Sequence, residues 1–399
     1  MNENEKFFKI DNIDFSPKNP LIIAELGTGH NGNIAKAKEL ILAASNAGAA
    51  CVKFQLVYAD EILHPNTGFV TLPGGKIRLY DRFKALESPP EFYAEIKEFT
   101  ESQGLIFLCT PFGLKSASIL RKMHPKIVKI ASPELNYTSL LEEIASWKLP
   151  VLLSTGVSRL SDIEAAIKIF KPQRTQSTQR KEESKSIPPA TCYLLPATCS
   201  LPATCLLHCV TSYPAPETDY NLRVLPNLAN TFKVSVGVSD HSLDPELVPA
   251  LAVAMGAAVI EKHFCLSQTD PGLDDPIALP PKDFAKMVKA IHRAAKDGSE
   301  DTINRYKTER GTLLVEQVLG NGIKELADSE RENYSRTNRS IHALRDITAG
   351  ETLKQSDYAV LRTEKTLRPG LDPSWEKTLE GRIVRQFIPN GEGIRLEDV

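Results

Sequence analysis

Two lysines stand inside short apolar runs of the sequence, where an ammonium group is unfavourable to bury. Lys53 lies in ACVKFQ and Lys129 lies in KIVKIAS. A buried ammonium needs an anion beside it. With the hydroxyls of Thr110, Ser132 and Ser154 from similar runs, the two lysines would suit a phosphate or a carboxylate. The alternative is that each lysine extends outward to solvent, which is easier to accept for one such lysine than for two.

Two histidines end two later runs of the same kind. His241 follows GVSD and His263 follows IEK. A lone histidine is by default a satisfied core residue, but two on neighbouring runs beside acidic residues favour an open metal site completed by water and substrate oxygens. We expect Mn2+ there, with Mg2+ or Co2+ as alternatives. Asp274 in DPGLDDP follows the second histidine and is either a solvated turn residue or an acceptor for a substrate hydroxyl.

The elements that must position these residues are eight short apolar runs alternating with segments of helical spacing. The runs are 21–26, 50–55, 105–109, 127–131, 151–154, 205–209, 234–238 and 258–262. This pattern predicts a (β/α)8 TIM barrel, in which functional groups lie at the carboxyl ends of the strands. The alternative, an open doubly wound sheet, lacks a dinucleotide-type glycine fingerprint after the first run.

Three segments depart from the alternation. Residues 171–203 are polar and Pro-rich and contain two complete PATC repeats and the start of a third, which ends at Cys205, so we interpret them as a low-complexity surface loop rather than a cysteine metal clip. Residues 58–87 are a candidate lid or a long surface loop. Residues 298–335 read as a charged, loop-like linker, and 336–399 as a small module of short strands and glycine turns. The predicted barrel occupies residues 1–297.

Composition excludes several classes of protein. The chain has 399 residues, with 48 Lys and Arg against 50 Asp and Glu and a formal charge of −2, so no basic surplus favours nucleic acid. The polar amino terminus does not resemble a secretory signal, and no apolar run approaches the ~18 residues that a spanning helix needs. Seven cysteines fit reduced thiols better than a disulfide framework. We expect a soluble cytoplasmic protein without nucleic-acid or membrane partners.

Nine short motifs follow one another along the chain: IAELGTGHNG, VKFQ, TPFG, KIASPE, STG, LLHCVTSYPAP, VGVSDHS, IEKHF and DPGLD. In their order and spacing they resemble the sialic acid synthase family, the nonulosonic acid synthases. The segment from RSIHALRDITAGETL to GRIVRQFIPNGEGI resembles that family's antifreeze-like (SAF) domain. The resemblance implies condensation of phosphoenolpyruvate with the open-chain aldehyde of an N-acetylated hexosamine, such as N-acetylmannosamine. The products would be a nine-carbon 2-keto sugar acid and phosphate.

The resemblance also implies roles for individual residues. Phosphoenolpyruvate would be held by Lys53, Thr110, Lys129, Ser132, Ser154 and Ser239. The metal would be held by His241 and His263, and the sugar by Glu25, Gln55, Tyr213, Asp274 and Arg339. Arg339 would reach the barrel of a partner chain in a homodimer with exchanged small domains. Glu134 is our candidate to orient or deprotonate the attacking water, and it would form the catalytic group with Glu25, Lys53 and Lys129.

Departures from the family pattern leave the acceptor open. Pro133 stands where glycine is common, Thr211 where some members have asparagine, and DPGLDDP replaces a frequent PGPDH. The acceptor is either N-acetylmannosamine or a diacetamido deoxy sugar of the legionaminic or pseudaminic type. Two other functions stay open. One is another phosphoenolpyruvate-dependent barrel synthase, whose phosphorylated acceptor would require a further basic cluster. The other is a non-catalytic glycan-binding protein.

Overall fold

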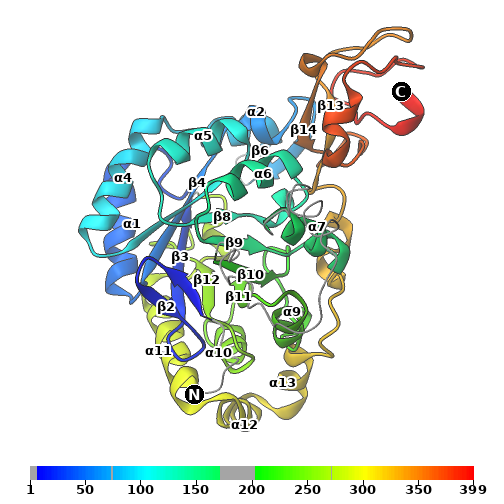
Figure 1. Cartoon of the computed structure of the whole chain (residues 1–399). Helices are drawn as coiled ribbons and strands as arrows, with labels where there is room; N and C mark the ends of the chain where they lie inside the picture. Colours follow the sequence, from blue (N-terminus) through cyan, green and yellow to red (C-terminus); the bar gives the residue numbers. More distant parts are fainter. Residues whose placement is uncertain (1–6, 73–74, 171–202, 271) are drawn as a thin grey trace, which may run out of the picture.

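A computed structural model describes residues 7–72, 75–170, 203–270 and 272–399. Its main body is a nearly closed barrel of eight parallel strands in the order β7-β4-β3-β12-β11-β10-β9-β8, and the two end strands contact each other (Figure 1). The strands are β3 (Leu21–Gly27), β4 (Cys51–Leu56), β7 (Ile106–Pro111), β8 (Val128–Ile130), β9 (Val151–Ser154), β10 (Thr204–Cys209), β11 (Ser235–Asp240) and β12 (Val259–His263). The eight expected runs coincide with these strands to within two residues, which confirms the predicted barrel.

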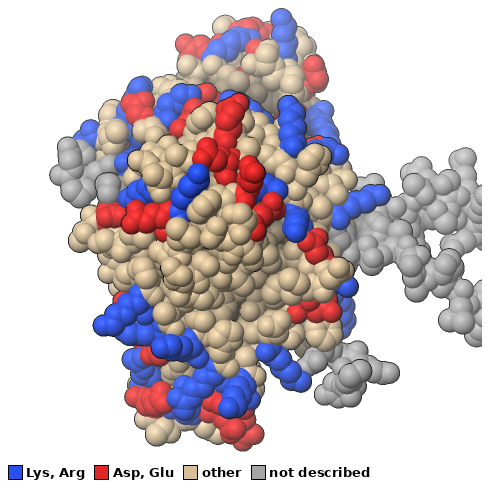
Figure 2. All heavy atoms as spheres, turned by 90° about the vertical axis from the view of Figure 1, so that its left-hand side faces the viewer, with Lys and Arg blue, Asp and Glu red and all other residues tan. Residues whose placement is uncertain are grey.

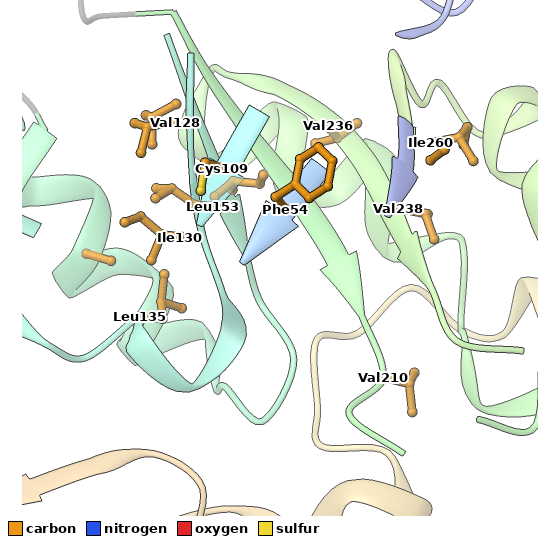
Figure 3. Close-up of a cluster of buried hydrophobic side chains, with 14 of the residues drawn as sticks. Phe54, Cys109, Val128, Ile130, Leu135, Leu153, Val210, Val236, Val238 and Ile260 are labelled. Carbon is orange, nitrogen blue, oxygen red and sulfur yellow. The ribbon is translucent and has the colours of Figure 1, made fainter. Parts of the chain in front are cut away.

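Helices enclose the barrel, so its strands are buried on both faces. Every residue of β3, β9, β10, β11 and β12 is buried, as is typical of parallel strands covered by helices. Outward side chains such as Phe54, Val236 and Ile260 belong to one large core between strands and helices (Figure 3). The helices are α1 (Ile34–Asn46), α4 (Pro90–Ser102), α5 (Leu114–Lys122), α6 (Thr138–Ser146), α7 (Leu160–Phe170), α9 (Val224–Phe232), α10 (Leu247–Ala254) and α11 (Pro281–Asp297).

A hairpin closes the amino end of the barrel. Strands β1 (Phe8–Ile10) and β2 (Ile13–Phe15) pair antiparallel, and Phe8, Ile10 and Phe15 pack into a second apolar cluster with the first inward residues of the barrel strands. This plug leaves the carboxyl end of the barrel as the place for a site.

The segment after the barrel is helical, so the expectation of a loop-like linker over 298–335 is wrong. It contains α12 (Ser299–Arg310), α13 (Thr312–Leu319) and a 3-10 turn over Asp328–Asn333. Acidic residues begin α12 and basic residues end it, which suits the helix dipole, although few of its side chains are apolar. The buried ring of Tyr306 packs α12 into the large core.

The small domain is built on an antiparallel pair, β13 (Arg339–Ala343) and β14 (Tyr358–Arg362). It also contains α14 (Glu376–Leu379) and a last 3-10 turn over Leu396–Asp398. The domain rests against the insertion after β4, which forms α2 (Ala59–Ile62), β5 (Phe69–Leu72), β6 (Gly75–Arg78) and α3 (Leu79–Lys84). Helix α2 contacts β14, so this insertion connects the barrel with the small domain. Apart from Ala203, the proposed low-complexity loop over 171–203 lies outside the described residues.

One face of the molecule carries charges of both signs. Figure 2 shows Lys and Arg interspersed with Asp and Glu above and below a broad band of uncharged residues. Among the helices that the structure describes, none combines the length and apolar character that crossing a membrane requires.

Candidate active site

Side-chain alternation along the strands gives the barrel interior an apolar half and a polar half. In β3, Leu21 and Ile23 join the apolar cluster above the hairpin, and Glu25 comes two residues later. In β4, Cys51 is followed in the same way by Lys53. Because alternate residues of a strand share a face, seven of the eight strands bring a polar group in this way to the carboxyl half of the interior. The others are Thr110, Lys129, Ser154, Ser239 and Glu261.

The two predicted lysines meet a buried carboxylate rather than solvent. Lys53 Nζ lies 2.7 Å from Glu261 Oε1 and 3.0 Å from Glu25 Oε2, and Lys129 Nζ lies 3.4 Å from Glu261 Oε1. Ser239 Oγ donates to the same Glu261 oxygen at 2.8 Å. The alternative that the lysines extend outward is therefore wrong, because their side chains are 6% and 3% exposed.

The charges of this cluster depend on one another. Burial lowers the pKa of Lys53 to about 7, with Lys129 acting in the same direction and Glu261 opposing both. Burial alone would raise the pKa of Glu261, but the two lysines hold it well below its usual range. The cluster therefore keeps a carboxylate next to ammonium groups that can also bind an incoming anion.

Several hydroxyls on the carboxyl side of the barrel lack partners. Thr110 Oγ1, Ser154 Oγ and Thr211 Oγ1 are buried and have no hydrogen bond to any described residue. Buried polar groups are nearly always bonded, so these three mark space for a ligand. Ser132 Oγ accepts the N–H of Gly156 at 3.0 Å, which leaves its own proton available. A Cβ on Gly156 would lie 2.2 Å from Thr211 Oγ1, so glycine is needed there.

The predicted histidines lie together at the same end of the barrel. The ring centroids of His241 and His263 are 5.4 Å apart, and Tyr213 stacks on His241 at 4.3 Å. His241 Nδ1 must donate to the carbonyl of Val210 at 2.9 Å, which leaves Nε2 as the unprotonated nitrogen, with Cys209 Sγ 4.0 Å from it. Burial lowers the pKa of His241 to about 4 and also lowers that of His263, so both rings are neutral, as a metal ligand requires.

This pair fits an open metal site, not a closed one. Among the described residues, no group of three or more His, Cys, Asp and Glu gathers as a complete ligand set. Asp274 Oδ2 stands 3.8 Å from His263 Nδ1 and does not complete one. Two neutral imidazoles could hold a divalent first-row ion whose other ligands are water and substrate oxygens.

Three of the residues predicted to bind sugar converge around one glycine. A Cβ on Gly27 would lie 3.3 Å from Gln55 Nε2, 3.4 Å from Glu25 Oε1 and 3.6 Å from Asp274 Oδ2. Gly27 also has φ +52°, a left-handed conformation that glycine adopts readily. Gln55 Nε2 donates to Glu25 Oε1 at 2.7 Å. Tyr213 reaches the same end of the barrel through its stack on His241.

The last two predicted residues form a buried ion pair. Arg339 lies on the barrel of its own chain, where its Nη2 is 2.9 Å from Glu134 Oε1 and both side chains are fully buried. The resemblance to the family implies instead that Arg339 reaches the barrel of a partner chain. The contact inside one chain is possible because the segment before Arg339 is attached to the same barrel through Glu330. The Oε2 atom of Glu330 accepts the N–H groups of two barrel residues, Val157 at 2.9 Å and Thr211 at 2.8 Å.

Sequence reasoning assigned no role to three residues of this region. Glu261 could have been found, because it precedes His263 by two residues on one strand and so shares its face. Glu330 and Arg362 carried no such signal, since the barrel pattern does not include their segments.

Family comparisons agree with this architecture. Residues 40–301 match the NeuB family and residues 338–399 match the SAF domain. The chain belongs to the NeuB family. It is 33% identical to the N,N'-diacetyllegionaminic acid synthase of Legionella pneumophila over 353 residues, which are 87% of this chain and 86% of the relative.

Two solved structures resemble this NeuB-family chain over most of its length. The crystal structure of the spore coat polysaccharide biosynthesis protein SpsE from Bacillus subtilis has a TM-score of 0.74 and 30% identity, covering 98% of this chain and 99% of that one. The N-acetylneuraminic acid synthetase of Leptospira borgpetersenii, in complex with citrate, has a TM-score of 0.61 and 30% identity, covering 84% and 96%.

Proposed function

We propose that this NeuB-family chain is a nonulosonic acid synthase that condenses phosphoenolpyruvate with the open-chain aldehyde of an N-acetylated hexosamine. The products are a nine-carbon 2-keto sugar acid and phosphate. The proposal depends above all on one observation. The barrel interior holds two buried lysines and three unpartnered hydroxyls at the end where the two neutral histidines lie. This combination suits a small anion beside a polarised carbonyl oxygen.

The lysines and hydroxyls would hold phosphoenolpyruvate. Lys53 and Lys129 supply positive charge, and Glu261 compensates them when the anion is absent. The hydroxyls of Thr110 and Ser154, which have no partner among the described residues, would donate to phosphate or carboxylate oxygens, as would Ser132. Ser239 would do the same by turning its hydroxyl away from Glu261. Two substrates held in line by rigid strands gain much of their reactivity from orientation alone.

The sugar would occupy the outer part of the site. Glu25, Gln55 and Asp274, which converge at Gly27, present acceptors and one amide donor to its hydroxyl and acetamido groups. A divalent ion held by His241 and His263, with Mn2+ as our choice, would polarise the aldehyde as a Lewis acid. Tyr213 stacks on His241 and covers this part of the site.

Glu134 would act on the water. When C3 of phosphoenolpyruvate forms a bond to the aldehyde carbon, positive charge develops at C2. Water adds there while Glu134 takes one of its protons, and the former aldehyde oxygen takes up a proton to become a hydroxyl. The C2–O bond to phosphate then breaks as the 2-keto group forms, and phosphate leaves toward the lysines. Glu134 Oε2 suits this task because it is buried and has no partner among the described residues.

We also propose that the chain forms a homodimer in which the small domains exchange. In an exchanged dimer the same residues meet across two chains. Arg339 of each chain would then make with the other barrel the contacts that it makes here with its own.

The direct test is to incubate the metal-supplemented protein with phosphoenolpyruvate and each candidate acceptor, and to measure phosphate. We expect release with N-acetylmannosamine or with a diacetamido-trideoxyhexose. Release only with a phosphorylated sugar such as erythrose 4-phosphate would favour another barrel synthase. Absence of release with every hexosamine would favour the glycan-binding alternative.

A further inference from the structure

The small domain brings two arginines, not one, to Glu134. Arg339 on β13 and Arg362 on β14 are cross-strand partners in the register of the antiparallel pair, so their side chains leave the sheet side by side. Arg362 Nη2 lies 2.7 Å from Glu134 Oε1, and its Nε lies 3.1 Å from the same atom. Arg339 approaches that oxygen with its Nη2 at 2.9 Å and its Nε at 3.1 Å.

The four N–H groups all converge on one of the two carboxylate oxygens. Arginine commonly binds a carboxylate with one N–H on each oxygen, which occupies both. Here Glu134 Oε1 takes both guanidinium groups, and Oε2 is buried without a partner among the described residues. The arrangement therefore fixes the carboxylate and keeps one oxygen open as a proton acceptor.

A single arginine would be enough to neutralise Glu134. Arg339 is fully buried and also donates to the carbonyls of Phe112 and Val360, so it is anchored without Arg362. The side chain of Arg362 is only 10% exposed, and Glu134 is the one carboxylate within ion-pair distance of it among the described residues. A second buried guanidinium is unfavourable to desolvate unless it has a further task.

We propose that Arg362 is a second positioning residue of the small domain, which with Arg339 directs Oε2 of Glu134 toward the reacting water. The inference rests on the proposed function for the role of Glu134. Arg362 acts through Glu134 and does not itself touch the substrates. The contacts are the same whether the small domain sits on its own barrel or on that of a partner.

The test compares Arg362→Met with Arg362→Lys in the full chain. Arg362→Met should lower kcat by about ten- to a hundredfold, as expected for one charge-assisted contact, with the KM for phosphoenolpyruvate within about twofold. Arg362→Lys should recover part of that loss. Arg345→Met is the matched control, since Arg345 pairs with Glu351 and Asp357 in the same domain, away from the barrel, and it should leave kcat unchanged.

A double-mutant cycle separates positioning from a structural role. In the Glu134→Gln background, Arg362→Met should cause no additional loss of kcat, because its effect passes through the carboxylate. An equal loss in both backgrounds would overturn the proposal, as would a wild-type kcat in Arg362→Met.

A crystallographic comparison needs no turnover and therefore distinguishes this proposal from the proposed function. Crystal structures of the wild-type protein and Arg362→Met should show the Glu134 carboxylate leaving its single position in the variant. If both carboxylate oxygens of Glu134 keep their wild-type positions in the Arg362→Met structure, the inference is overturned, whatever the substrates are. Absence of turnover by the wild-type protein would overturn only the proposed function.

Discussion

Two buried carboxylates, Glu261 and Glu134, are neutralised in different ways. Glu261 on β12 is inside the barrel and meets Lys53 from β4 and Lys129 from β8, two other strands of the same barrel. Glu134 follows β8 at the carboxyl end of the barrel, which we call the mouth. It meets Arg339 and Arg362 of the small domain, which lie about two hundred residues later in the chain. The inner cluster is formed when the barrel forms, whereas the cluster at the mouth requires the small domain to dock. The proposed anion site is therefore built by the barrel alone, and the proposed water-activating group is completed by a second domain.

Loss of a lysine should affect the inner cluster most strongly. Lys53→Met leaves Glu25 and Glu261 close together without their shared cation, so we expect a loss of about 3–5 kcal/mol in the free energy of unfolding. Denaturant unfolding measures this loss. Lys53→Met combined with Glu261→Gln should recover part of the stability because it removes one of the uncompensated charges. Unchanged stability in the single variant would show that the inner cluster is not held by this charge balance.

The proposed metal site consists of His241 and His263, whose ring centroids are 5.4 Å apart. His241→Ala or His263→Ala should abolish Mn2+ binding in calorimetry and lower turnover by about a thousandfold or more, because the Lewis acid is lost. The exposed His292 on α11 provides the matched control, and His292→Ala should bind Mn2+ like the wild type. Unchanged Mn2+ affinity in both site variants would contradict the assignment.

Mixing two inactive variants tests whether the contact between Glu134 and Arg339 forms within one chain or between two. Lys129→Ala and Arg339→Ala should each be inactive, and their mixture should recover up to about a quarter of the activity if small domains exchange in a homodimer. In that case some sites combine an intact barrel with an intact arginine from the partner chain. If the mixture stays inactive although native mass spectrometry confirms heterodimers, Arg339 acts only within its own chain, through the contact with Glu134 that this structure shows.

The smallest expected effect is a pH dependence set by the inner cluster. Burial brings the pKa of Lys53 to about 7, so its charge is present below that pH and is lost as the pH rises through it. The value of kcat/KM for phosphoenolpyruvate should therefore fall by up to about tenfold per pH unit above 7. Lys53→Arg should remove this decline because a guanidinium keeps its charge. The same alkaline decline in Lys53→Arg would assign it to another group.

The barrel could be predicted because it follows from local sequence periods. Eight apolar runs indicate its strands, and two lysines inside such runs indicate an anion site, but the sequence argument left the direction of Lys53 and Lys129 open and gave no role to Glu261, which joins them. The linker could not be predicted in this way, since α12 is charged on most of its surface and only Thr302 and Tyr306 are buried. The contacts of Arg362 and Glu330 arise from docking of distant segments, which no local period encodes.

The central claim is that this barrel joins phosphoenolpyruvate to an unphosphorylated N-acetylated hexosamine. Mass spectrometry of the reaction with N-acetylmannosamine and with a diacetamido-trideoxyhexose tests it most directly. The account predicts a product whose mass equals one acceptor plus pyruvate, together with one phosphate for each product molecule. Phosphate released without such a product, or a product formed only from a phosphorylated sugar, would contradict it.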